Sequence, residues 1–193
     1  SVVTDKRGRT WVATYLGGLF CGTAESGFRQ FRGQKELKSD KIYCLEYSKE
    51  DDIIYIGTHG NGMSVISPSQ EKVIRTFADD DNKWISNLYI DRSGLVWIGT
   101  YNGPMCYDPE TGKMLVLNVD ENLSTMVRSF CETEDGTLWV GTGAGLVKFD
   151  RSTGETICFT EDVGLSSNVI NDIQEGNDGN LWISTQYGLN RFN

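Results

Sequence analysis

The sequence predicts an all-β protein, and three observations support this. The 193 residues include 22 glycines and only 3 prolines, a composition typical of tight turns between antiparallel strands. Helical periodicity does not extend over any long segment. One strand-like segment recurs five times along the chain, which is the sequence signature of a repeat architecture.

The recurring segment is an apolar strand that carries a tryptophan or a tyrosine. Its copies occupy residues 10–14, 54–58, 96–100, 138–142 and 181–185. The aromatic residues of successive copies are 42 to 44 residues apart; they are Trp11, Tyr55, Trp97, Trp139 and Trp182. A period of about 40 to 45 residues is that of a four-stranded propeller blade. We therefore expect a β-propeller of about five antiparallel blades, with each aromatic segment as the second strand.

The whole chain, 1–193, is interpreted as a single β-propeller segment. The expected blades span residues 1–37, 40–80, 84–120, 125–162 and 168–193, the first and last being incomplete. Rings close with about 4 to 8 blades, and a ring of seven such periods needs roughly 290 residues. We expect a fragment of a larger seven-bladed propeller, with a closed five-bladed ring and self-association of the fragment as alternatives.

The aromatic strands are apolar on both faces, as expected for blades packed between two neighbours. The residue two positions after each aromatic is small: Ala13, Gly57, Gly99, Gly141 and Ser184. We predict that it leaves room for a bulky side chain of the adjacent blade. The four repeated tryptophans are accordingly assigned to packing between blades.

Charge and cysteine content exclude several classes of function. The formal net charge of −9 argues against nucleic acid as a partner, and the chain has no apolar run long enough for a membrane segment. The five cysteines form no CxxC pair and the chain has one histidine, so no metal site or cofactor is expected. No disulfide is expected either, because Cys21 and Cys106, like Cys44 and Cys131, lie two blades apart.

The sequence contains no catalytic constellation. His59 is the single histidine, so a Ser-His-Asp or Cys-His set has no spare member, and no catalytic residue is assigned. The run Asp79-Asp80-Asp81 is interpreted as a solvated loop, because it lacks the ligand rhythm of a calcium loop. We expect a segment that is not an enzyme.

A candidate ligand face lies on the loops that join the second and third strands, together with the connections between blades. These loops carry aromatics beside amides, which suit a sugar with its apolar C–H face and rim of hydroxyls. Trp84 stands outside the repeat positions. The candidate ligand-binding residues are Trp84, Tyr101, Asn102, His59, Asn61, Tyr187, Gln186 and Tyr15.

The repeat unit Asp-x-x-Gly-x-x-Trp-Ile-Gly-Thr, followed by Gly-Leu and Tyr/Phe-Asp-x-x-Thr-Gly, resembles the two-component regulator propeller repeat. The third blade carries it at Asp91, Gly94, Trp97, Ile98, Gly99, Thr100, Tyr107, Asp108, Thr111 and Gly112, and the fourth from Asp135 to Gly154. The second blade departs from it at Tyr55 and Asp52, and the third at Pro104-Met105.

The resemblance implies a role. Such repeats form the periplasmic sensor region of hybrid two-component system histidine kinases, whose usual signal is an oligosaccharide from a complex glycan. It implies a periplasmic location and, as partners, such an oligosaccharide and other blades of the same parent protein. Two alternatives stay open: a scaffold for protein–protein interaction and, less favoured because of the single histidine, an enzyme similar to streptogramin lyases.

Overall fold

The computed structural model describes residues 1–78, 83–115 and 125–193. The acidic run Asp79-Asp80-Asp81 and the segment 116–120 of the third expected blade lie outside these residues, apart from which the chain forms two compact units, 1–90 and 91–193. Each unit is described by itself.

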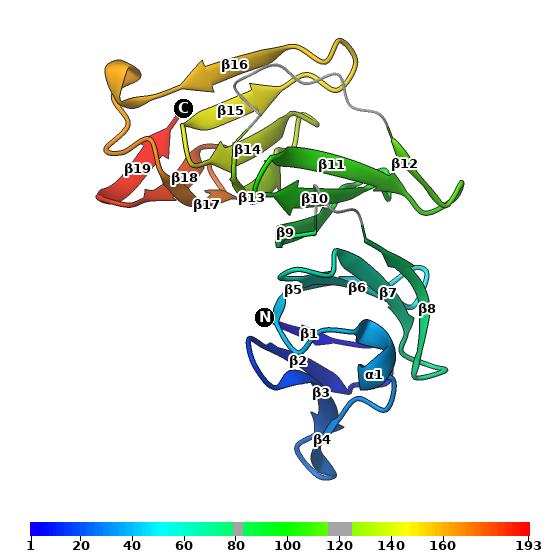
Figure 1. Ribbon diagram of the computed structural model, residues 1–193. Coiled ribbons are helices and arrows are strands. Elements are labelled where there is room, and N and C mark those ends of the chain that lie inside the picture. The colour runs from blue at the N-terminus through cyan, green and yellow to red at the C-terminus, as the bar shows by residue number, and fades with distance from the viewer. Residues whose placement is uncertain (79–82, 116–124) are drawn as a thin grey trace. The chain divides into compact units, whose positions relative to one another are not determined.

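The first unit contains two antiparallel four-stranded sheets and the strand that follows them (Figure 1). The first sheet contains β1 (Val2–Thr4), β2 (Thr10–Thr14), β3 (Gly18–Thr23) and β4 (Gly27–Gln30). The second contains β5 (Ile42–Ser48), β6 (Ile53–Thr58), β7 (Met63–Ser67) and β8 (Lys72–Phe77). The short helix α1 (Gln34–Leu37) lies between the sheets in sequence, and β9 (Ile85–Ile90) closes the unit.

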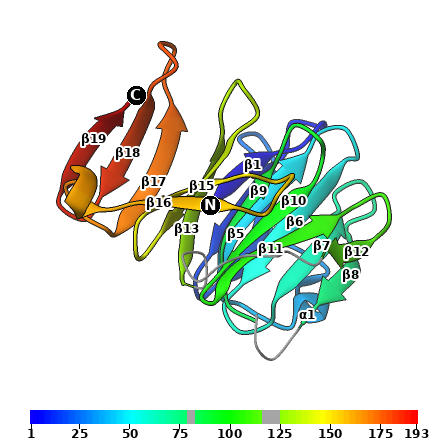
Figure 2. The ribbon, with the colours of Figure 1, turned by 90° about the horizontal axis from the view of Figure 1, so that it is seen from above.

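The second unit continues the same pattern, and Figure 2 shows its last three strands side by side. It begins with β10 (Val96–Thr100), β11 (Gly103–Asp108) and β12 (Lys113–Leu115). A four-stranded sheet follows, made of β13 (Val127–Glu132), β14 (Leu138–Thr142), β15 (Leu146–Phe149) and β16 (Thr156–Phe159). After a 3₁₀ segment (Glu161–Val163) come β17 (Ile170–Glu175), β18 (Leu181–Thr185) and β19 (Gly188–Phe192).

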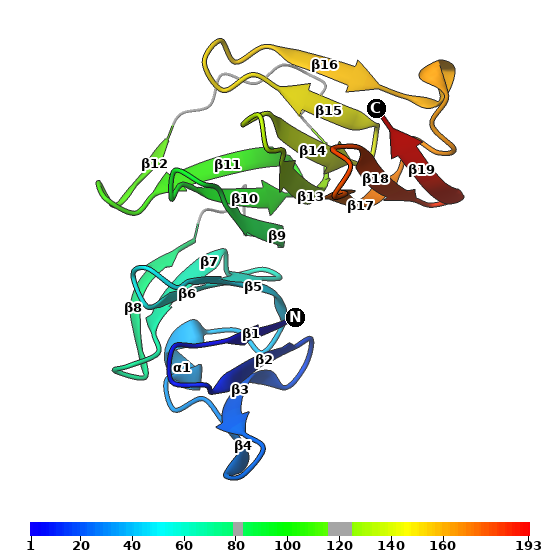
Figure 3. The ribbon, with the colours of Figure 1, turned by 180° about the vertical axis from the view of Figure 1, so that it is seen from behind.

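The strand order confirms the prediction of an all-β fold. The five aromatic segments are β2, β6, β10, β14 and β18, and each is the second strand of its period along the chain (Figure 3). The first sheet holds four strands, of which β1 is only three residues long, and the last sheet holds three. Among the described residues no helix is long and apolar enough to cross a membrane.

The small residue of the second strand packs against the next blade, as predicted. A Cβ added at Gly57 would lie 2.6 Å from Ile85 Cγ2 at the start of β9, and one at Gly141 would lie 2.8 Å from Ile170 Cγ2 in β17. These distances are shorter than any ordinary contact, so only glycine lets the neighbouring isoleucine approach.

The repeated tryptophans differ in burial, and the assignment of Trp182 to packing is wrong. Trp11, Trp97 and Trp139 are buried, and each ring contacts a phenylalanine ring. Trp182 is 40% exposed, because β18 lies in the last sheet of the sequence and no later sheet provides a covering side chain. Repeat position alone therefore does not decide burial. The five cysteines, all within the described residues, form no disulfide.

Candidate functional site

A threonine closes the loop between the second and third strands in every blade. The Thr58 hydroxyl donates to the Gly62 carbonyl oxygen at 2.8 Å and accepts the Asn61 backbone N–H at 3.1 Å. The same pair of bonds is made by Thr14, Thr100, Thr142 and Thr185. Because both ends of each loop are tied to one side chain, the residues between them project from a fixed base.

The enclosed loops are longer in the first unit than in the second. Residues 15–17 and 59–61 make three-residue loops, whereas residues 101–102, 143–144 and 186–187 make two-residue loops. The longer loops carry Tyr15 and His59 at their first positions.

The loop 59–61 is held from two sides by backbone hydrogen bonds. The His59 N–H donates to the Lys41 carbonyl, just before β5, at 2.9 Å. The N–H groups of Gly60 and Gly62 both donate to the Lys83 carbonyl, at 3.0 and 2.9 Å, and His59 and Trp84 form a β-bridge. Trp84, outside the repeat, is thereby fixed beside His59.

A β-bulge places a further aromatic residue on this face. In the ladder between β5 and β6, Ile42 pairs with Thr58 and Cys44 pairs with Gly57, so Tyr43 is an extra residue without a ladder partner. Ile42 and Cys44 are buried while Tyr43 is exposed. Bulges commonly re-aim a side chain next to a functional site.

The four rings of Tyr15, Tyr43, His59 and Trp84 form one group, named the aromatic cluster. His59 stacks on Tyr43 with ring centroids 5.6 Å apart and on Trp84 at 5.8 Å, both with an interplanar angle of 22°. Tyr15 meets Tyr43 edge-on at 5.6 Å. The three larger residues remain between 42% and 49% exposed, so the cluster presents apolar ring faces and polar ring atoms to solvent.

The cluster is suited to binding by stacking. Exposed aromatic rings held rigidly can cover the apolar face of a ligand at little entropic cost. The Asn61 amide donates to the Lys38 carbonyl at 3.0 Å and so braces the loop. Within the described residues no group of three or more His, Cys, Asp or Glu side chains could hold a metal ion.

The structure gathers three of the eight candidate residues. Tyr15, His59 and Trp84 are in the aromatic cluster, and Asn61 lies in the same loop as His59. The other four belong to the second unit, on the loop after β10 (Tyr101, Asn102) and the loop after β18 (Gln186, Tyr187). Tyr43 was not predicted; its sequence signal is an aromatic residue between the apolar Ile42 and Cys44 at the start of a strand.

A family model described as two component regulator propeller matches residues 73–102, 123–144 and 164–187. No curated protein matches the chain.

Three solved structures resemble the chain. The extracellular domains of BT3049 and BT4673 from B. thetaiotaomicron, described as hybrid and one component systems, are each 24% identical, with TM-scores of 0.80 and 0.82. Each match covers 99% of this chain but only 26% and 27% of the larger ones. Virginiamycin B lyase from Staphylococcus aureus is 16% identical with a TM-score of 0.76, over 98% of this chain and 64% of the lyase. These likenesses confirm the β-propeller fold.

Proposed function

Since the chain carries two component regulator propeller repeats, we propose that it is part of the extracytoplasmic, periplasmic sensor region of a hybrid two-component signalling protein. The aromatic cluster is its ligand-binding surface, and the ligand is an oligosaccharide from a complex glycan. The chain spans about a quarter of the length of the two extracellular domains that it resembles, so in this proposal further blades and a signalling part belong to the same parent protein.

The observation that carries the proposal is the exposed stack of four rings from four separate segments. A pyranose ring has an apolar C–H face that packs on an aromatic face, and its hydroxyls need partners to replace lost water. Trp84 and Tyr43 supply exposed faces on either side of His59. The His59 side chain is thus engaged in stacking, which supports a binding role rather than catalysis.

Removal of the cluster aromatics tests the proposal by calorimetry with a panel of glycan oligosaccharides and the intact sensor region. Trp84→Ala and Tyr43→Ala should each weaken binding by about 1 to 3 kcal/mol, as for aromatic hot spots. Phe28→Ala is the matched control, because Phe28 is an exposed aromatic of the same unit on β4, outside the cluster. Unchanged affinity in folded Trp84 and Tyr43 variants would show that this face is not the site.

A protein-interaction surface is the second candidate. Leu16 follows Tyr15 in the same loop and is also exposed, and an exposed leucine contributes apolar area without any sugar-specific contact. A Leu16→Ser variant separates the two. It should leave saccharide affinity unchanged and should weaken binding of a protein partner.

A further inference from the structure

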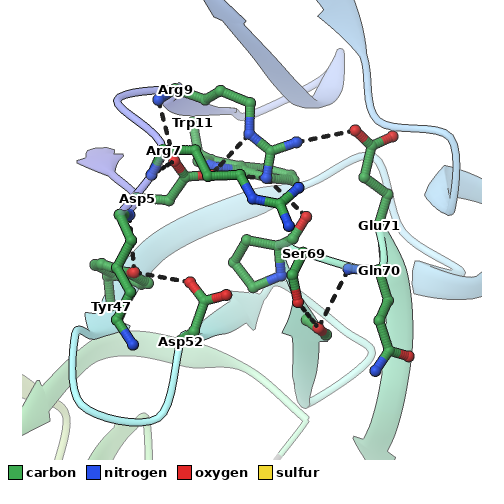
Figure 4. Close-up of polar contacts among 12 residues, drawn as sticks. Asp5, Arg7, Arg9, Trp11, Tyr47, Asp52, Ser69, Gln70 and Glu71 are labelled. Atoms are coloured by element: carbon green, nitrogen blue, oxygen red, sulfur yellow. Dashed lines mark hydrogen bonds and ion pairs between the residues drawn. The ribbon is translucent and has the colours of Figure 1, made fainter.

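A buried aspartate begins the turn before the second strand in two blades. Asp5 accepts hydrogen bonds from the backbone of Arg7 and Arg9 and from Trp11 Nε1, the last at 2.9 Å (Figure 4). Burial works to raise the pKa of Asp5, but these hydrogen bonds outweigh it and hold the pKa below its usual value. Asp91 likewise accepts from Trp97 Nε1 at 2.8 Å.

In both blades a guanidinium group completes the arrangement. Arg9 pairs with Asp5 at 2.8 Å and with Glu71 at 2.9 Å, and its Cζ lies 5.3 Å from the centre of the Trp11 ring (Figure 4).

In the second unit Arg151 takes this role. Its guanidinium pairs with Asp91 at 2.9 Å and with Glu132 at 2.7 Å, and its Cζ lies 5.9 Å from the Trp97 ring. Each guanidinium therefore lies against an indole and between two carboxylates, although the two arginines occupy different repeat positions.

The next joint of the second unit repeats the frame. Trp139 meets Phe192 edge-on at 5.5 Å, as Trp97 meets Phe149 at 5.7 Å. Glu175 accepts the Glu134 backbone N–H at 2.9 Å, as Glu132 accepts that of Arg92 at 2.8 Å. Glu175 thus corresponds to Glu132, and Trp139 corresponds to Trp97.

Here the frame surrounds a hollow of about 470 Å³. Trp139, Phe192, Glu134, Asp135 and Glu175 line it, and no arginine or lysine is among the described residues that do so. Lys148 lies across the strand pair from Trp139, with its Nζ 5.9 Å from the Trp139 ring, but it is not part of this lining. The hollow therefore has the indole and the carboxylates of the Arg151 site without its guanidinium.

We propose that this hollow binds a guanidinium group. Carboxylates accept the planar guanidinium fork, and an indole face attracts the cation. The inference rests on the repeated joint and is independent of the saccharide proposal. The group can belong to an arginine side chain in a polypeptide or to a free guanidinium compound.

Titration of the 193-residue chain with N-acetyl-L-arginine amide and with methylguanidinium tests the assignment, followed by the Trp139 indole N–H signal in ¹H–¹⁵N spectra. Saturable shifts at Trp139, without comparable shifts at Trp97, are expected. Binding of both probes supports a site for the guanidinium group itself. Binding of the acetylated arginine alone supports an arginine side chain, and binding of methylguanidinium alone supports a free compound.

Glu175→Gln should weaken binding about tenfold, the effect of one charge-assisted hydrogen bond, while its amide oxygen still accepts the Glu134 N–H. Glu134→Gln, at an exposed position, gives a second variant that leaves that backbone bond in place. Asp162→Asn removes one charge outside the hollow and should have no effect. The proposal is overturned if neither probe binds, if N-acetyl-L-lysine amide binds equally well, or if both glutamine variants bind as the parent does.

Discussion

The joints around Trp11 in the first unit and around Trp97 in the second contain the same groups in the same contacts, but the arginine comes from different places. Arg9 lies in the turn before its own tryptophan, whereas Arg151 follows β15 of the next blade. Glu71, also from the next blade, pairs with Arg9. The constant feature is the set of contacts around the indole, so aligning the repeats by sequence does not match the two arginines.

The opposite ends of the strands show a second difference between the units. The three-residue loops of the first unit bring Tyr15 and His59 into one aromatic cluster, while the second unit has two-residue loops. Loop length and the Tyr43 bulge, with an unchanged sheet, separate a surface with stacked rings from one whose loops carry only Tyr101 and Tyr187 as aromatics.

The largest expected effect is on the two arginine joints. Arg151→Ala should lower the free energy of unfolding by about 3 to 5 kcal/mol, because it leaves uncompensated the buried carboxylates of Asp91 and Glu132, whose side chains are 0% and 5% exposed. Arg9→Ala should cost a similar amount if the joints are equivalent. Urea unfolding followed by tryptophan fluorescence measures both.

The control for these variants is Arg29→Ala. Arg29 also pairs with Glu71 but is largely exposed, so its loss should cost about 0 to 1 kcal/mol. An Arg9→Ala variant as stable as Arg29→Ala would break the equivalence of the two joints.

Packing between blades should be equally tight in the two units. Gly57→Ala and Gly141→Ala should each lower the free energy of unfolding by about 1 to 3 kcal/mol, because the new methyl group would overlap Ile85 or Ile170. Gly143→Ala is the control, since its nearest atom to an added Cβ is 3.7 Å away. A neutral Gly141→Ala would mean that the joint of the second unit can relax.

A pH dependence should distinguish the first unit. Burial raises the pKa of Glu46 to about 7, whereas Cys131 and Gln174 hold the corresponding positions of β13 and β17. An acid whose folded pKa exceeds its unfolded value weakens folding as pH rises from about 4.5 to about 7. Glu46→Gln should therefore stabilise the protein by about 1 to 2 kcal/mol at about pH 8, the partial exposure of the side chain reducing the effect.

The gain in the Glu46→Gln variant should vanish at about pH 4, where the parent glutamate is protonated in both states. Chemical unfolding at the two pH values measures it. Equal gains at both would assign the effect to packing rather than to ionisation.

The smallest expected effect is on the loops. Thr58→Val and Thr142→Val each remove a buried hydroxyl that holds two backbone groups, at a cost of about 1 to 2 kcal/mol. Amide hydrogen exchange should accelerate more at Asn61 than at Ala144, because the loop of the first unit is one residue longer. The reverse order would show that the contacts to Lys41 and Lys83, not the threonine, fix the longer loop.

The spacing of the aromatic strands was sufficient to predict the sheets, and the small residues at Gly57 and Gly141 predicted the close approach of the next blade. Tyr15, His59 and Trp84 could be predicted as site residues because loops vary on a repeated frame. Tyr43 could not, since a bulge depends on how two strands pair. Trp182 was misassigned because burial depends on a neighbour, and the exchange of Arg9 for Arg151 depends on side-chain reach across blades.

The threonine closure has an evolutionary consequence. Two-residue and three-residue loops end on the same hydroxyl and the same glycine carbonyl, so a codon can be gained or lost there without shifting the strand register. Each loop can then diversify separately after duplication of its repeat, and loops can be exchanged between blades as interchangeable parts. Such a scaffold lets recognition change quickly while the residues that maintain folding stay under constraint.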